Sequence, residues 1–166
     1  MSESPLEMSM LSKYNKHDGI SYFDHYETDV DGIPNNVNVD QLAKAFFLSP
    51  AFTPERLLLS KLAPNKHNIS REELNQVEEF KVGNNVAIFN VIEKSDSEIL
   101  FKSDPDTLTW LAVEREKDDK MKLHFGSAIL KPNIVSRIFT PFHKFYSRYL
   151  LGFAKEQLVQ QTRESK

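Results

Sequence analysis

The amino-acid sequence predicts an α+β fold, in which an antiparallel β-sheet is wrapped around a long C-terminal helix and short helices follow the first strand. From residue 86 to residue 130, extended segments are separated by short polar turns, which is typical of consecutive antiparallel hairpins. From residue 132 onward, apolar side chains recur at steps of three and four, the period of one face of an α-helix. A sheet with one apolar face needs a cover, and this final helix supplies it.

Composition is that of one ordinary globular domain. The chain has 166 residues, of which 40% are hydrophobic and 27% are charged. We predict an N-terminal arm over residues 1–19 and a single domain over residues 20–163. The formal net charge of −3 provides no positive field for nucleic acid, so no nucleic-acid partner is expected.

Targeting signals and cysteine chemistry are also absent from the sequence. No apolar run reaches the roughly 20 residues that span a bilayer, and the first residues lack the apolar core of a signal peptide. We therefore expect no transmembrane segment and a cytoplasmic location. The chain contains no cysteine, which excludes disulfides, thiol nucleophiles and thiolate metal sites.

The segment Ile20–Val30 is predicted to be the first strand because it alternates in the manner of a pleated chain. The alternation places Tyr22 and Tyr26 on one face of the strand, and Phe23 and His25 on the other.

Helix signals follow this strand. Apolar residues spaced by three and four predict a helix over Val39–Leu48, which Pro50 ends. Thr53-Pro54-Glu55 supplies an N-cap, a first-turn proline and an acid, and therefore predicts a second short helix. Ser70 to Glu73 has capping-box spacing, which predicts the start of a third helix or a turn.

A turn over Val82–Asn85 separates the helical half from the sheet. Beyond it, the predicted strands are Val86–Glu93, Glu98–Lys102, Thr107–Glu114 and Met121–Leu130.

The final helix is predicted to cover the sheet through one apolar stripe. The stripe consists of Val135, Ile138, Phe142, Phe145, Tyr149 and Phe153. Pro141 lies inside this helix and is expected to kink its axis.

The order of these elements resembles that of the START-like (SRPBCC, or helix-grip) superfamily. Such proteins typically have seven strands, so the resemblance implies further strands, which are sought in Leu11–Asn15 or Val77–Val82. More specifically, residues 82–151 resemble the bacterial domain-of-unknown-function 2867 family. The matching residues are Val82-Gly83, Val86, Phe89, the Glu98 strand, Pro141-Phe142-His143 and Tyr149-Leu150-Leu151. The family's Gly-Arg pair ahead of Pro-Phe-His reads Ser136-Arg137 here. Some members carry a dinucleotide-binding domain, but no G-x-G-x-x-G follows a strand here, and no cofactor is expected.

The resemblance implies binding of a small hydrophobic or amphipathic molecule in a cavity between the sheet and the C-terminal helix. A cyclase-, hydratase- or isomerase-type enzyme that moves a proton through a pocket His or Tyr is an alternative. A protein-interaction module or homodimer without ligand is a second alternative. Filled and hollow cores share one apolar pattern, so the sequence leaves all three open.

Aromatic and polar side chains near the expected cavity are the candidates for its lining. They are Trp110, His143, Tyr26, Tyr146, Phe89, Phe125 and Phe142. Trp110 and His143 are candidates to line the cavity together, although a structural role is the favoured interpretation for each.

No metal site is predicted. His25 and Glu27 share a strand face, but a zinc deaminase would also need thiolate ligands. The segment from Glu27 to Gly32 imitates a calcium loop, but Asn38 stands where the bidentate glutamate belongs. The sequence also lacks G-x-S-x-G, Walker and H-E-x-x-H motifs, which disfavours the commonest serine hydrolases, nucleotide binders and zinc proteases.

Overall fold

The structure is a computed structural model that describes residues 9–15, 22–31, 37–52, 71–86, 89–103, 107–116, 120–130 and 134–164. The helical elements are α1 (Ser12–Asn15), α2 (Val39–Leu48), η1 (Pro50–Phe52), α4 (Arg71–Gln76) and α5 (Ile134–Glu164). The strands are β1 (Tyr22–Val30), β2 (Asn85–Val86), β3 (Phe89–Lys94), β4 (Glu98–Ser103), β5 (Thr107–Arg115) and β6 (Met121–Ile129).

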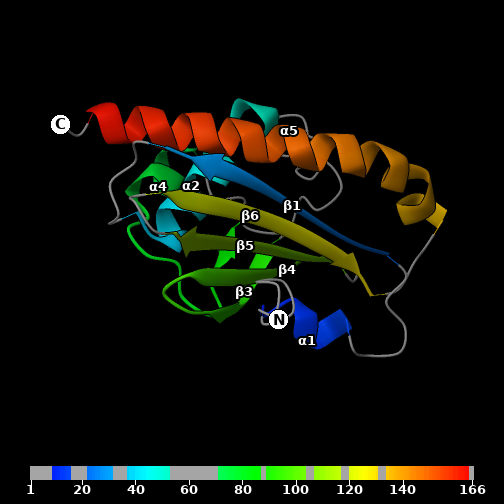
Figure 1. Ribbon diagram of the computed structural model, residues 1–166. Coiled ribbons are helices and arrows are strands. Elements are labelled where there is room, and N and C mark those ends of the chain that lie inside the picture. The colour runs from blue at the N-terminus through cyan, green and yellow to red at the C-terminus, as the bar shows by residue number, and fades with distance from the viewer. Residues whose placement is uncertain are drawn as a thin grey trace.

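These strands form one antiparallel sheet in the order β1-β6-β5-β4-β3-β2. Figure 1 shows the long helix α5 lying along one face of the sheet, with α2 on the same side and α1 on the opposite side. This confirms the predicted α+β fold, in which a C-terminal helix packs on an antiparallel sheet as in a helix-grip protein. We call the side that carries α2 and α5 the helix face, and the side that carries α1 the outer face.

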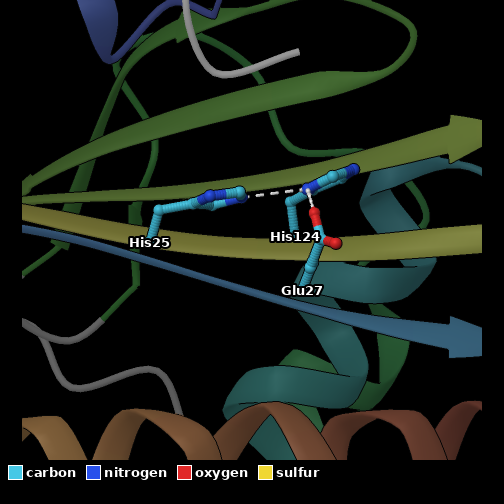
Figure 2. A group of neighbouring side chains, drawn as sticks. All are labelled: His25, Glu27 and His124. Carbon is cyan, nitrogen blue, oxygen red and sulfur yellow. Dashed lines mark hydrogen bonds and ion pairs between the residues drawn. The ribbon is translucent and has the colours of Figure 1, made fainter. Parts of the chain in front are cut away.

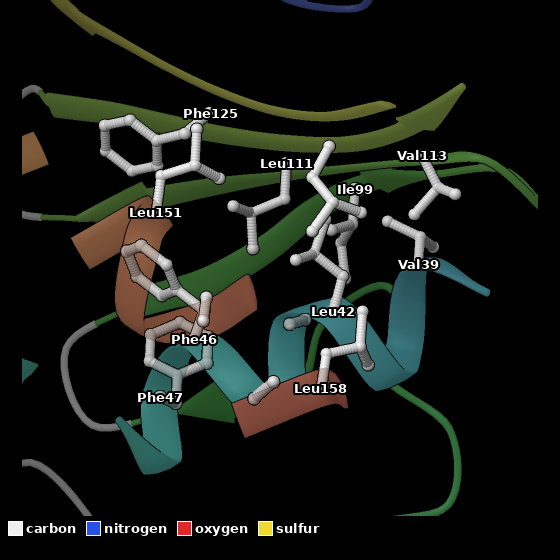
Figure 3. Packing of buried hydrophobic residues seen from close by; sticks show 14 of the residues in the cluster. Val39, Leu42, Phe46, Phe47, Ile99, Leu111, Val113, Phe125, Leu151 and Leu158 are labelled. Carbon is white, nitrogen blue, oxygen red and sulfur yellow. The ribbon is translucent and has the colours of Figure 1, made fainter. Parts of the chain in front are cut away.

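The main core lies on the helix face and is rich in phenylalanine. The buried rings are Phe46, Phe47, Phe52, Phe80, Phe89, Phe101 and Phe125. Phe46 stacks on Phe125 with ring centroids 5.4 Å apart, and Phe47 meets Phe101 edge to face at 5.2 Å. Figure 3 shows α2 inserting Leu42 and Phe46 between the sheet and α5. Burying each such side chain contributes about 1.5–3 kcal/mol.

The predicted helix over Val39–Leu48 is confirmed, and its start is fixed by a capping box. The side chain of Asn38 accepts from the Gln41 N–H, and the Gln41 side chain accepts from the Asn38 N–H. In the first turn, the Asp40 carboxylate accepts from the Phe80 N–H at 2.8 Å and pairs with Lys94 at 2.9 Å. These contacts tie α2 to the chain that enters the sheet.

The predicted strands are confirmed within a few residues, but both places where further strands were sought are wrong. Ser12–Asn15 is helical, and residues 77–82 contain no strand. The additional strand is β2, within the predicted turn and strand around Asn85. In that turn Gly83 adopts a φ of 91°, a conformation that favours glycine.

The stripe predicted to face the sheet is wrong at Phe145 and Tyr149, whereas Phe153 is half-buried and packs against the core. Phe145 is 81% exposed and Tyr149 is 58% exposed. The helix instead buries Leu150, Leu151, Ala154 and Leu158. The helix face is already filled by phenylalanine rings, so α5 packs there through aliphatic and small side chains. The aromatic residues form a second stripe of the same period.

Two predictions fall outside the described residues, namely the helix from Thr53 and the Ser70 cap. Helix α5 continues through Pro141. Among the described helices, none combines the length and apolar character needed to cross a membrane.

Candidate functional site

The structure separates the residues predicted to line one cavity. Phe89 and Phe125 lie in the aromatic core, and the half-buried Tyr26 and Tyr146 pack against it. Trp110 lies on the outer face, in a second cluster with Leu11, Leu100 and Leu108. His143 and Phe142 belong to α5, but their side chains lie outside the described part of the chain.

The expectation that Trp110 lines the side facing the C-terminal helix is therefore wrong. Successive residues of a strand point to opposite faces, and Leu111 and Val113 take the helix face of β5. Trp110 must then take the outer face, where its indole N–H donates to Glu98 Oε2 at 2.8 Å. Glu98 also accepts from the Met10 N–H at 2.9 Å, which fixes the N-terminal segment over Trp110.

A buried polar group interrupts the helix face on β1 and β6. Asp24 is 8% exposed and accepts from the Ser127 N–H at 3.1 Å and the Ser127 hydroxyl at 2.5 Å. The Tyr22 hydroxyl donates to the other Asp24 oxygen at 2.8 Å. A buried carboxylate needs such donors, because burial otherwise disfavours its charge.

Two phenols and a guanidinium extend this group toward α5. Burial, followed by the hydrogen bond to Asp24, raises the pKa of Tyr22 above its ordinary range. Burial and the Asp24 charge also raise the pKa of Tyr26, whose ring lies 5.2 Å from the Arg148 guanidinium carbon. Both phenols therefore keep their protons at neutral pH, and Tyr22 donates its proton to Asp24.

The outer face carries a second polar group, in which two histidines meet (Figure 2). His25 Nε2 lies 3.0 Å from His124 Nδ1, and the rings are stacked with centroids 5.3 Å apart. Glu27 Oε2 approaches His124 Nδ1 at 3.9 Å. The ligand atoms of His25, Glu27 and His124 all lie within 4.8 Å of one another.

A carboxylate on the other side of His124 defines the protonation of this pair. His124 Nε2 lies 3.0 Å from Glu114 Oε2, so Nε2 carries the proton that is donated. His124 Nδ1 is then left with a lone pair, which accepts the His25 Nε2–H. His124 is 1% exposed, whereas the carboxylate of Glu27 reaches solvent with 52% of its side chain exposed.

His25 is neutral at neutral pH. Burial, followed by the neighbouring His124, lowers the pKa of His25 below the ordinary histidine value. The charges of Glu27 and Asp24 oppose this shift, and Lys122 adds to it.

The sequence indicated only half of the histidine cluster. Alternation placed His25 and Glu27 on one face, but the position of His124 depends on the pairing of β1 with β6. In that register Glu27 is directly opposite His124, and His25 is opposite Gly126. Glu114 then arrives from β5, diagonal to His124 across the other edge of β6. Register across strands is a long-range property that the spacing of residues within one segment does not contain.

No protein-family model matches this chain, and no curated protein matches it. The resemblance to the domain-of-unknown-function 2867 family and to START-like proteins therefore stays a prediction.

Proposed function

We propose that the protein binds a small amphipathic molecule between the helix face of the sheet and the first half of α5. The observation that carries the proposal is the polar group of Asp24, Tyr22, Tyr26 and Arg148 at the margin of the aromatic core. Binding sites for such molecules combine an apolar lining with a few polar groups that orient the ligand. The margin of the aromatic core next to β1 offers both an apolar lining and polar groups that could orient a ligand.

The second half of α5 is anchored and leaves little room for a ligand. Leu151 and Leu158 pack with Leu42 and Phe46 of α2, as Figure 3 shows. Tyr26 lies at the edge of this packing, directly opposite Phe125 in the sheet register. A ligand would therefore place its apolar body beside Phe125 and its polar end beside Tyr26.

The polar end of the ligand is expected to be acidic. Arg148 is exposed, carries a permanent positive charge with several N–H donors, and lies over the ring of the protonated Tyr26. The neighbouring Asp24 carboxylate already accepts from Ser127 and Tyr22. Hydrogen-bond donors and positive charge thus lie on the α5 side of the polar group around Asp24, where the acidic end of a ligand would bind.

Native mass spectrometry of protein purified from its own host tests this proposal. A mass that disappears on denaturation supports binding, and its formula gives the ligand class. As a second measurement, anilinonaphthalene sulfonate combines apolar rings with an acidic group. We expect it to fluoresce on binding, and Arg148→Gln to weaken that binding, while Arg163→Gln at the exposed end of α5 leaves it unchanged. Absence of both signals, or equal effects of the two variants, would contradict the proposal.

The alternative of a homodimer is favoured by a specific feature, the exposed side of α5. Phe145 and Tyr149 are exposed there, and Gly152 lies one turn further along the same side. A Cβ at Gly152 would meet no atom within 4 Å, so crowding inside the described part of the protomer does not require this glycine. Glycine inside a helix costs about 0.5–1 kcal/mol relative to alanine, and close approach of a second helix is one reason to keep it.

Charge favours a second copy of this chain as the partner. If two α5 helices pair antiparallel and cross at Gly152, Arg148 lies opposite Glu156 of the partner subunit, because each is four residues from the crossing point. Sedimentation across a range of concentrations tests this. We expect Arg148→Glu to weaken association and Arg148→Glu with Glu156→Arg to restore it, whereas a strict monomer at every concentration would exclude the dimer.

A further inference from the structure

We propose that His25, Glu27 and His124 form a binding site for one divalent transition-metal ion, and that zinc suits it best. The site lies on the outer face of the sheet, on the opposite side from the proposed ligand site (Figure 2). It is therefore independent of the proposed function. Two imidazoles and one carboxylate form a donor set that zinc accepts, with further positions left for water.

The spacing of the ligand atoms is close to that of a bound ion. His25 Nε2 and His124 Nδ1 are 3.0 Å apart. Two nitrogens bound tetrahedrally to zinc at about 2.0–2.1 Å lie about 3.3 Å apart. An ion therefore fits if the two nitrogens separate by a few tenths of an ångström and both rings turn so that their lone pairs converge on one point.

Glu27 can complete the set without movement of the backbone. Its Oε2 lies 3.9 Å from His124 Nδ1, somewhat longer than the distance between two ligands of one zinc ion. The side chain is 52% exposed, so its rotamers are free to bring the carboxylate inward. The same exposure gives the ion a path from solvent.

Glu114 prepares His124 for this role. Metal-binding histidines usually donate their other ring N–H to a carboxylate, which fixes the tautomer and orients the ring. His124 Nε2 lies 3.0 Å from Glu114 Oε2, and this contact leaves the lone pair of Nδ1 directed at His25. In this arrangement His25 Nε2 carries the shared proton, so binding at Nε2 requires that this proton move to Nδ1.

Surrounding residues hold the two rings in place. The ring of Trp110 lies 5.7 Å from that of His25 and 5.8 Å from that of His124, measured between centroids.

Lys122 opposes the binding of a cation, since its ammonium lies 3.5 Å from Glu27 Oε1. That ammonium is also paired with Glu116 at 3.3 Å, and the carboxylates of Glu27, Glu114 and Glu116 together outweigh its charge.

Cobalt(II) is a suitable spectroscopic probe for the site and is used with protein that carries no affinity tag. Titration of the full chain with Co²⁺ is expected to give visible absorption bands that saturate at one ion per chain. Because the chain has no cysteine, these bands must arise without thiolate ligands. Zn²⁺ is expected to displace Co²⁺ and abolish the absorption, as its higher affinity for nitrogen ligands requires.

Variants distinguish this site from unspecific binding. His25→Gln and Glu27→Gln each remove one ligand and are expected to weaken Co²⁺ binding at least about tenfold. Glu114→Gln leaves all three ligands but is expected to weaken binding by about 10- to 100-fold through the loss of the oriented His124. Glu79→Gln, which changes an exposed carboxylate paired with Lys94, is the matched control and should bind as the unaltered protein does.

The circular dichroism melt of each variant without metal checks that it folds. Glu27 is exposed, so its variant keeps the test valid even if a histidine variant fails to fold. Saturable binding at one ion per chain that Glu27→Gln weakens and Glu79→Gln does not would support the site. Absence of saturable binding, or equal affinity in Glu27→Gln and the unaltered protein, would overturn it.

Discussion

The two faces of the sheet differ in what they bury, although the same strands build both. On the helix face, alternate residues of β4, β5 and β6 join a core of phenylalanine, leucine and valine. On the outer face, a smaller cluster around Trp110 and Leu11 adjoins His25 and His124. Much of the apolar burial therefore lies on one side, while the paired histidines lie on the other. Substitutions on the two faces should affect different properties.

The largest expected effect is on the helix face. Phe47 is 1% exposed and contacts the rings of Phe46, Phe89 and Phe101, so Phe47→Ala should lower the free energy of unfolding by about 3–5 kcal/mol. Phe145→Ala is the matched control, because the Phe145 side chain is 81% exposed, and it should change the free energy of unfolding by less than about 0.5 kcal/mol. Urea denaturation measures both. Equal losses in the two variants would show that Phe145 is buried in solution.

On the outer face, Gly126 controls how closely the N-terminal segment packs. A Cβ at this position would lie 2.8 Å from Leu11 Cδ2 and 3.0 Å from Trp110 Cε3. We expect Gly126→Ala to lower the free energy of unfolding by about 1–3 kcal/mol through overpacking. The double variant with Leu11→Ala should lose less than the sum of the single variants, because the shorter side chain removes one clash. Strict additivity in urea denaturation would contradict this contact.

The sequence predicted the strands and the first long helix because their signals are local. Alternating residues defined β1 and β6, and a three-to-four period that ends before Pro50 defined α2. The side of Trp110 was not predictable in this way. Strand β5 is apolar on both faces, since Leu108 and Trp110 face outward while Leu111 and Val113 face the helices. A strand buried on both sides carries no alternation that identifies its faces.

The sequence did not predict which side of α5 is buried, nor that the histidines form a cluster, and the two reasons are related. Helix α5 carries an aliphatic stripe and an aromatic stripe with the same period, and the sequence could not show which one the packed phenylalanines on the sheet would accept. His124 joins His25 only through the register of β1 with β6. Both features depend on contacts between segments far apart in the chain, whereas the local patterns describe one segment at a time.

Gly152 contrasts with Gly126, because no described atom lies where its Cβ would be. We expect Gly152→Ala to raise the free energy of unfolding of the monomer by about 0.5–1 kcal/mol, since alanine restricts the unfolded chain and suits a helix. Urea denaturation at low protein concentration measures this gain. If the α5 pairing occurs, the same variant weakens association, so a rise in stability together with a rise in the dimer dissociation constant would support both inferences. A loss of monomer stability would show that Gly152 is crowded.

The smallest expected effect is the pH dependence contributed by His25 on the outer face. Its folded-state pKa is lowered by burial and by His124, so below the ordinary histidine pKa of about 6.5 the unfolded chain binds more protons than the folded protein. This contribution to stability is full above about pH 6.5, declines as the pH falls through that value, and levels off below the lowered pKa. His25→Gln removes the titrating group, so its melting temperature should fall less than that of the unaltered protein between about pH 7.5 and about pH 5.5. The range stays above the titration of most carboxylates, and identical slopes in the two proteins would show that His25 is as solvated when folded as when unfolded.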